Sequence, residues 1–169
     1  MDGTDLERIE AVAAALPIPV PWSLDTFVDA LSDQRRRAIH LRPLEGPGGV
    51  DMPTGLWVPT PEVDHVFFET STSVPHQEHI ICHELAHMIL RHEPDPTQSG
   101  HYLRRVFEQI DPGLIEAARA RTSYRLVEEQ EAETLATLIL GGATRQLHTP
   151  PNAEPGSGHE WDALLGFEL

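Results

Sequence analysis

The spacing of apolar residues predicts two short helices in the first part of the chain. Within residues 4–37, apolar side chains recur at helical intervals in two stretches that the proline-rich segment 17–21 separates. Each proline removes a backbone donor and fixes φ, so a helix does not continue through this segment. Ser23 is placed to cap the second helix, and the arginines at 35–37 stand where cations complement a helix C-terminus. We therefore interpret this arginine triplet as a helix end rather than a binding patch.

From residue 38 the pattern of apolar positions changes from helical to extended. Three short runs are separated by segments rich in glycine and proline. The runs cover residues 38–43, 55–59 and 65–69. This pattern predicts a small, mainly antiparallel three-stranded sheet within residues 38–70, and we expect the run at 65–69 to be an edge strand.

Helical periodicity returns after Pro75, a residue suited to the first turn of a helix. A long helix is predicted over 75–92, and another over 124–140 that Gly141 and Gly142 would end. Two weaker helical patterns lie between them, at 102–109 and 112–121.

These elements predict one domain of the α+β class over residues 1–142, in which the sheet packs with about five helices. The remaining residues, 143–169, read as a linker rich in proline and glycine followed by a short apolar tail. A chain of 169 residues has room for one core of ordinary size, and no second cofactor-binding or DNA-binding domain is expected beside it.

The charge of the chain excludes two classes of target. With 12 basic and 27 acidic residues, the formal net charge is −15, and all the basic residues are arginine. A chain this acidic repels phosphate backbones and anionic membranes, so neither direct nucleic-acid binding nor membrane binding is expected. The single cysteine, Cys82, excludes an intramolecular disulfide, and the first residues lack the features of a secretory signal. We therefore expect a cytoplasmic protein.

The predicted helix over 75–92 contains the sequence HELAH at 83–87, which is the H-E-x-x-H motif of zinc hydrolases. Residues four apart lie one turn apart on one helix face, so His83 and His87 can bind the same metal ion. Glu84 lies about 100° round the helix, where its carboxylate can take a proton from zinc-bound water. Cys82 is expected to pack in the core as a small apolar residue.

Two other histidines of the same helix compete for a role at the metal. His79 lies one turn before His83, but three turns of one helix do not easily provide three tetrahedral ligands, so we interpret His79 as lining the cleft. His92 projects about 180° from His83 if the helix continues to it, which favours a structural or helix-end role.

The third ligand is expected on the predicted helix over 124–140, which carries an acidic cluster at 128–133. On a helical wheel Glu131 lies among apolar positions, whereas Glu129 and Glu133 point to the far side. A carboxylate on an apolar stripe needs a cation, and a zinc ion held by two histidines of a neighbouring helix would meet that need. Glu128, on the same side, is the alternative ligand.

In these two segments the chain resembles the ImmA/IrrE family of zinc metallo-endopeptidases. The resemblance rests on QEHIICHELAH at 77–87 and EAETLA at 131–136, the latter similar to the family's E-A-x-x-F-A signature with leucine at position 135. It implies a minimal zincin-like fold, Zn²⁺ bound by His83, His87 and Glu131, and Glu84 as the catalytic base. It also implies the substrate class, helix-turn-helix repressors that are cleaved to release transcription.

We therefore expect a regulatory metallo-endopeptidase. Its substrate would bind in extended form and pair with the strand at 65–69. The donor that stabilises the oxyanion remains open among Tyr124, His101, Tyr102 and Arg125. One alternative is a non-catalytic regulatory partner of the same fold, which binds a repressor or a toxin-system protein without cutting it. Another is a structural zinc domain, but structural zinc sites usually have four protein ligands rich in cysteine, and this chain has a single cysteine.

Overall fold

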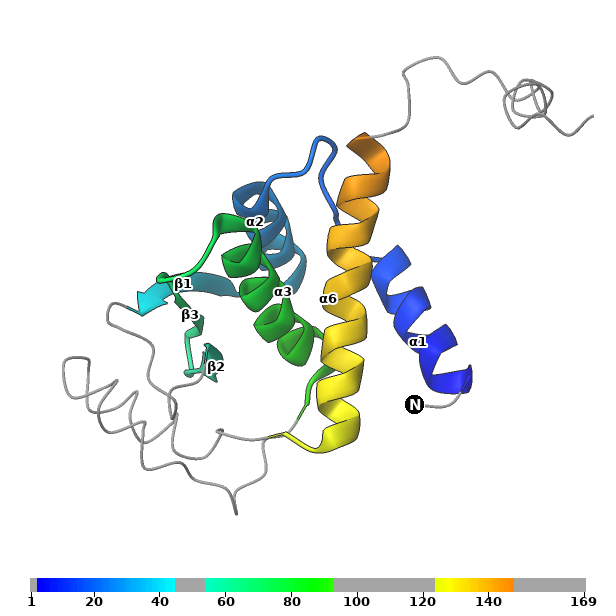
Figure 1. The fold of residues 1–169 in the computed structure, drawn as a ribbon. Coiled ribbons are helices and arrows are strands. Elements are labelled where there is room, and N and C mark those ends of the chain that lie inside the picture. The colour runs from blue at the N-terminus through cyan, green and yellow to red at the C-terminus, as the bar shows by residue number, and fades with distance from the viewer. Residues whose placement is uncertain (1–2, 45–53, 93–123, 148–169) are drawn as a thin grey trace, which may run out of the picture.

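The computed structural model describes residues 3–44, 54–92 and 124–147, with the side chains of 143–147 left aside. These residues form four helices and one three-stranded sheet, an α+β arrangement as predicted (Figure 1). The elements in chain order are α1 (Gly3–Ala14), α2 (Leu24–Arg35), β1 (Ala38–Leu44), β2 (Gly55–Pro59), β3 (Val63–Glu69), α3 (Val74–Leu90) and α6 (Leu126–Leu147). The two weaker helices predicted at 102–109 and 112–121 lie outside the described residues.

The sheet is mixed rather than mainly antiparallel, which corrects the sequence-based prediction. Its strand order is β1-β3-β2, with β3 parallel to β1 and antiparallel to β2. The strand predicted to lie at an edge, β3, is therefore the central one. Residues 64–67 of β3 form a continuous buried run, a pattern typical of a strand covered on both faces.

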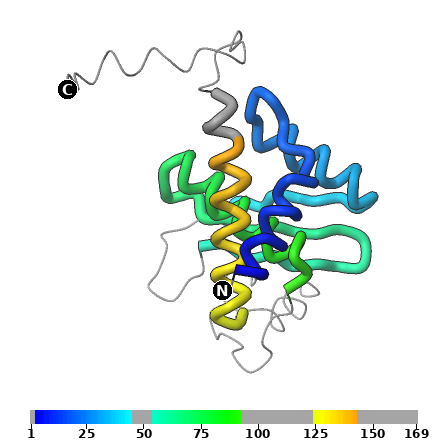
Figure 2. Tube along the Cα trace, turned by 90° about the vertical axis from the view of Figure 1, so that its right-hand side faces the viewer, coloured from blue at the N-terminus to red at the C-terminus, as the bar shows by residue number. Residues whose placement is uncertain are grey.

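α3 lies between the sheet and α6, and α1 packs on the opposite side of α6 (Figures 1 and 2). The core forms where these layers meet, and its fully buried members come from α1, α2, the sheet, α3 and α6. Cys82 belongs to this core, which confirms the prediction that it packs as an apolar residue. Burial and the Glu78 carboxylate raise the pKa of its thiol to about 12, so the thiol stays protonated.

The helix ends show how local sequence sets these elements. Ser23 caps α2 as predicted, since its hydroxyl accepts a hydrogen bond from the Thr26 amide at 3.3 Å. α2 ends at Arg35, and the next residue, Arg36, adopts a left-handed conformation. α6 differs from the prediction because it continues through Gly141 and Gly142 to Leu147. Glycine lowers helix propensity by only about 1 kcal/mol, which neighbouring interactions outweigh here. None of the helices in the described ranges is both long and apolar enough to cross a membrane.

The arginine triplet has a structural role at the end of α2. The Asp64 carboxylate on β3, which is 1% exposed, accepts hydrogen bonds from Arg35 at 3.1 Å and from Arg37 at 2.8 Å. It also accepts one from the indole of Trp57 at 3.1 Å. This buried acid therefore ties α2 to the two strands β2 and β3.

We expect Asp64→Asn to lower the free energy of unfolding by about 3 kcal/mol, because it leaves two arginines without their countercharge. Urea denaturation followed by circular dichroism measures this effect. Glu62→Gln, at an exposed acid of the same hairpin, is the matched control and should stay within about 0.5 kcal/mol of the wild type. An equal midpoint for Asp64→Asn and the control would contradict the structural role of this ion cluster.

Candidate metal centre

The two histidines of the H-E-x-x-H motif face each other on one side of α3. Their Nε2 atoms lie 3.0 Å apart, and their rings meet edge to face with centroids 4.7 Å apart. The opposite side of α3 carries Ile81, Cys82 and Leu85 into the core, so burial of that side orients the histidines toward α6. The spacing expected from the sequence therefore brings both imidazoles together.

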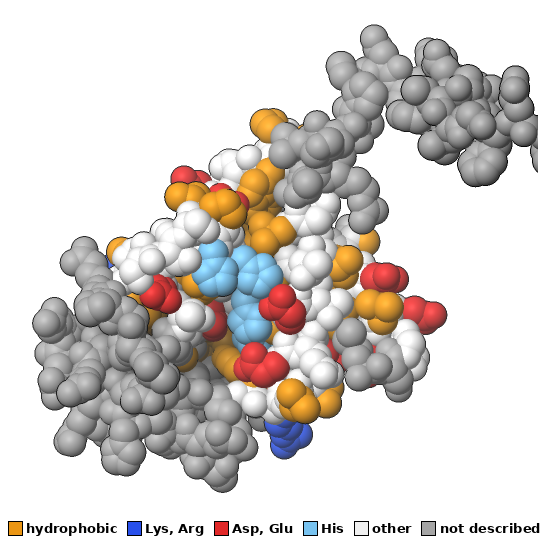
Figure 3. Space-filling view, in the orientation of Figure 1, with side chains coloured by type: hydrophobic (Ala, Val, Ile, Leu, Met, Phe, Trp, Pro, Cys, Tyr) orange, Lys and Arg blue, Asp and Glu red, His pale blue; other side chains and the backbone are white. Residues whose placement is uncertain are grey.

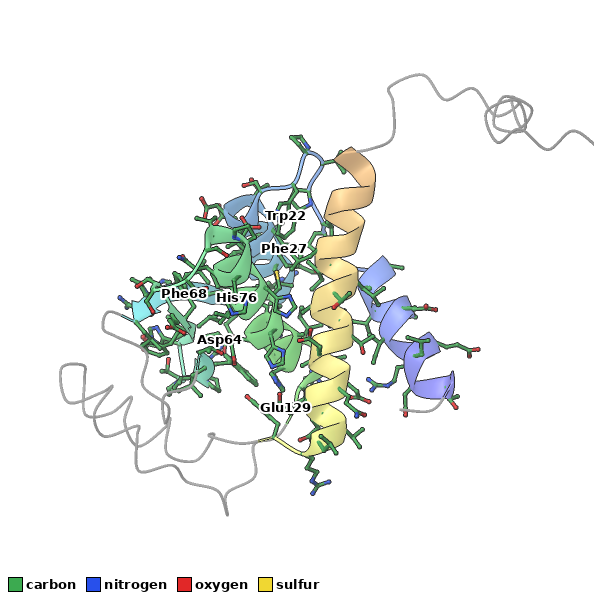
Figure 4. The ribbon with its side chains drawn as sticks, viewed as in Figure 1. Trp22, Phe27, Asp64, Phe68, His76 and Glu129 are labelled. Atoms are coloured by element: carbon green, nitrogen blue, oxygen red, sulfur yellow. The ribbon has the colours of Figure 1, made fainter. Side chains whose placement is uncertain are left out.

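Glu129 of α6 completes a group of three possible metal ligands. The ligand atoms of His83, His87 and Glu129 all lie within 4.8 Å of one another. The Glu129 carboxylate approaches His83 Nε2 at 3.3 Å through one oxygen and His87 Nε2 at 3.8 Å through the other. Glu129 lies at the start of α6, where its side chain approaches the two histidines of α3 (Figure 4).

The spacing of these atoms fits a tetrahedral ion. Nitrogen and oxygen ligands about 2.0–2.2 Å from zinc lie about 3.3–3.5 Å from one another. The two histidine nitrogens lie 3.0 Å apart, and the nearest Glu129 oxygen lies 3.3 Å from His83 (Oε2) and 3.8 Å from His87 (Oε1), all close to that range. Two imidazoles and one carboxylate are also a donor set that zinc accepts in catalytic sites, where a fourth position stays open for water.

Glu131, the residue expected to be the third ligand, lies elsewhere. Its carboxylate forms an ion pair with Arg8 of α1 and contacts Nε2 of His92 at 3.0 Å. Burial raises the pKa of this carboxyl, but the hydrogen bonds from Arg8 and His92 outweigh burial and hold the pKa below its usual value. An inward carboxylate on an apolar stripe needs a cation, and for Glu131 that cation is Arg8.

Two other candidate ligands also have different partners. The Glu128 carboxylate accepts a hydrogen bond from the backbone amide of Arg125 at 2.9 Å, as in a capping box at the start of α6. His79 contacts the Glu133 carboxylate at 3.1 Å and lies at the edge of the site, consistent with a residue that lines a cleft.

The wheel analysis that turned Glu129 and Glu133 away from the site is wrong, since both carboxylates contact His83. A helical wheel assumes a single buried face for α6. In the structure α6 packs between α3 and α1, so Glu131 meets α1 and the end of α3 while Glu129 and Glu133 meet the middle of α3 (Figure 1). A signal was present in the sequence, because these two acids have the same four-residue spacing as the paired histidines.

His92 turns back toward the site because α3 ends before it. Arg91 adopts a left-handed conformation (φ 58°), and the His92 amide donates a hydrogen bond to the His87 carbonyl at 3.0 Å. This is a Schellman turn, formed here without the usual glycine. His92 Nδ1 then lies 2.9 Å from His87 Nδ1. The expected helix-end position is confirmed, and the turn adds a side-chain contact that a continued helix would not make.

Glu84 lies beside the paired histidines with one oxygen unengaged. The backbone of Trp57 donates a hydrogen bond to its carboxylate, whereas Oε2 is buried and has no hydrogen-bond partner among the residues that the structure describes. Burial raises the pKa of Glu84 to about 7, against the opposing effects of His83 and of the Trp57 bond. A buried unpaired carboxylate oxygen is costly, so a bound water or cation fits this position.

A glycine on β2 makes room for the Glu84 side chain. A Cβ built at Gly55 would lie 2.7 Å from Glu84 Oε1 and 2.7 Å from a methyl carbon of Ile80. No larger residue fits without moving the carboxylate. The edge of the sheet and the motif helix are therefore in direct contact at the proposed base.

The two histidines differ in their electrostatic surroundings. Burial lowers the pKa of His83, but the carboxylates of Glu129, Glu84 and Glu133 outweigh it and raise the pKa overall. For His87, burial together with His83 and His92 lowers the pKa to about 2, so this ring is neutral. A raised pKa at His83 means that the carboxylates around it favour a positive charge at this position, which is what a metal ion provides.

Tyr124 covers one face of His87. The two rings are stacked with centroids 3.6 Å apart and planes inclined by 14°. Among the proposed oxyanion donors, Tyr124 is therefore placed at the site, while Arg125 provides the amide that Glu128 caps. His101 and Tyr102 lie outside the described residues.

The site opens to the surface on the side of α6. A pocket of about 640 Å³ is lined by His83, Glu129, Gln130, Glu133 and Thr134. Histidine side chains gather in the middle of this face with acidic side chains beside them (Figure 3). A metal ion and a substrate would both have access from this side.

Neither family models, curated proteins nor solved structures give a match to this chain.

Proposed function

We propose that this protein is a zinc-dependent metallo-endopeptidase with His83, His87 and Glu129 as the metal ligands. The observation that supports the proposal most strongly is the grouping of two imidazole nitrogens and one carboxylate on two packed helices, with their ligand atoms within 4.8 Å of one another. The resemblance to the ImmA/IrrE enzymes implies Glu131 as the third ligand, and we replace it with Glu129 because Glu131 is occupied by Arg8 and His92.

Glu84 would act as the general base. Zinc, when bound, lowers the pKa of a coordinated water toward about 7 and polarises a carbonyl group. The unengaged Oε2 of Glu84 is the acceptor for the water proton, and the same carboxyl group can then give this proton to the leaving amine. Trp57 and Gly55 hold the carboxylate in place through a backbone hydrogen bond and close contact.

The extended substrate would lie along β2 rather than along β3. β3 has a neighbour on each side, whereas β2 is at one edge of the sheet formed by the described strands. Because Gly55 on β2 contacts Glu84, a peptide that adds to this edge passes directly beside the proposed base.

The substrate class that we propose is a helix-turn-helix repressor, as the resemblance implies. The chain's net charge of −15 and the acidic side chains at the mouth of the site favour a basic protein surface over DNA itself. We propose a cytoplasmic location, which the single buried thiol of Cys82 suits.

Incubation of the full chain and Zn²⁺ with a library of proteome-derived peptides tests the proposed activity. We expect new N-termini, detected by mass spectrometry, that disappear when 1,10-phenanthroline removes the metal and return when zinc is added back. A helix-turn-helix protein encoded beside this gene is the first intact substrate to examine. A repressor that is displaced from DNA but remains intact would instead support the non-catalytic partner.

A further inference from the structure

A row of hydrogen-bonded side chains lies behind His87, on the side away from the proposed metal. His87 Nδ1 lies 2.9 Å from His92 Nδ1, and His92 Nε2 lies 3.0 Å from a carboxylate oxygen of Glu131. The other oxygen of Glu131 pairs with Arg8 of α1. His87, His92 and Glu131 are each less than one tenth exposed, so water does not compete freely for these bonds. The row joins α1, α6 and the end of α3.

The carboxylate at the end of this row fixes the direction of its hydrogen bonds. A carboxylate that is paired with arginine only accepts, so His92 Nε2 donates to Glu131. Neutral imidazole has one N–H group, and His92 Nδ1 is then an acceptor. His87 Nδ1 must donate to it, which leaves the lone pair of His87 on Nε2.

That lone pair has the orientation that a metal ligand requires. His87 Nε2 faces His83 Nε2 at 3.0 Å and the Glu129 carboxylate at 3.8 Å, at the centre of the proposed site. The opposite direction would require His92 to carry two protons. Arg8 already pairs with the other oxygen of Glu131, so this carboxylate has a countercharge without a second proton on His92.

The backbone prevents His92 from leaving the row. The Schellman turn at Arg91 ties the His92 amide to the His87 carbonyl, so the same two residues are joined through both main chain and side chain. The Tyr124 ring restricts His87 from one face. Rotation of His87 away from the site would break the bond to His92 and the stack on Tyr124.

We propose that His92 and Glu131 are positioning residues, which hold His87 in the tautomer and orientation that leave Nε2 free for the metal. The inference rests on the metal site proposed above, and it gives the motif-matching Glu131 a role other than ligation. Partners of this kind typically change metal affinity about 10–100-fold when removed.

Three variants of the full chain separate positioning from folding. His92→Phe keeps a planar ring but removes both nitrogens. His92→Gln keeps an amide oxygen that accepts from His87 and an amide N–H that donates to Glu131. Glu131→Gln keeps the size of the side chain and removes the acceptor-only group that sets the direction. Asp64→Asn is the control, because it breaks another buried ion cluster, with Arg35 and Arg37.

Three measurements are needed on each variant: the His87 tautomer, the zinc affinity and the stability of the metal-free fold. Long-range ¹H–¹⁵N correlation spectra of the metal-free protein report which nitrogen of His87 carries the proton. Competition with a chromophoric chelator gives the zinc dissociation constant, and thermal unfolding in EDTA gives the stability of the metal-free fold.

We expect His87 of the wild type to be protonated on Nδ1, and His92→Phe to shift the proton toward Nε2 and weaken zinc binding about 10–100-fold. Glu131→Gln should shift the tautomer and the zinc affinity in the same direction, His92→Gln should recover most of the affinity, and Asp64→Asn should change stability only. Wild-type tautomer and zinc affinity in both His92→Phe and Glu131→Gln would overturn the proposal, as would an Nε2 proton in the wild type. A wild type that has the Nδ1 proton but binds no zinc would overturn the proposed function alone.

Discussion

Glu84→Gln should keep the zinc content of the wild type and lower peptidase kcat about 100- to 10,000-fold, the range typical for loss of a general base. The amide has nearly the same size as the carboxylate, so it fits beside Gly55, where even an added Cβ would lie 2.7 Å from Glu84 Oε1. Its oxygen can still accept the hydrogen bond from the Trp57 backbone. It cannot take a proton from water, so only the chemical step is lost.

To test this result, zinc content is measured by atomic absorption and peptide cleavage is measured on the same sample. Glu78→Gln is the matched control, because Glu78 lies on the same helix and accepts a hydrogen bond from Trp22 Nε1 at 3.1 Å, away from the three ligands. We expect this control to cleave at the wild-type rate. Full activity in Glu84→Gln would refute the proposed mechanism, and zinc loss in that variant would assign Glu84 to metal binding instead.

The second large effect is expected at Glu129, where the structure and the family resemblance give different ligands. Loss of a residue that only holds a ligand in place weakens metal binding about 10–100-fold. Glu129→Gln should weaken zinc binding by more than this, because it removes the only carboxylate among the three grouped ligands. Glu131→Gln should weaken it less, since Glu131 acts through His92. Glu128→Gln should leave it unchanged, because Glu128 caps α6.

Zinc dissociation constants for these three variants, measured side by side by chelator competition, decide between the two ligand sets. The substitutions are chemically identical and lie within four consecutive residues, so differences in helix propensity are small. If Glu131→Gln lost zinc entirely while Glu129→Gln retained it, the ligand set implied by the resemblance would be correct and the present assignment wrong.

Local sequence patterns were sufficient to predict most of the described helices and strands and the two histidines of the site. Helical periodicity and Ser23 predicted α2, and the four-residue spacing of His83 and His87 predicted that their rings share one side of α3. Each of these features depends on residues within one or two turns, where chain geometry leaves few alternatives. The strand order was not predictable in this way, because the position of β3 between β1 and β2 depends on the pairing of β1 with β3, two strands that β2 separates in the sequence.

The acidic cluster of α6 shows where sequence alone stops. From the sequence we predicted that Glu131 of this cluster would approach the paired histidines, since an inward acid needs a cation. Which carboxylate does so was decided by the packing of α6 between α1 and α3, which directs Glu131 toward Arg8 and Glu129 toward the histidines. The Schellman turn likewise decided the place of His92. A helical wheel gives the angle of a residue about its own axis, whereas the identity of the neighbouring helix on each side is a property of the tertiary structure.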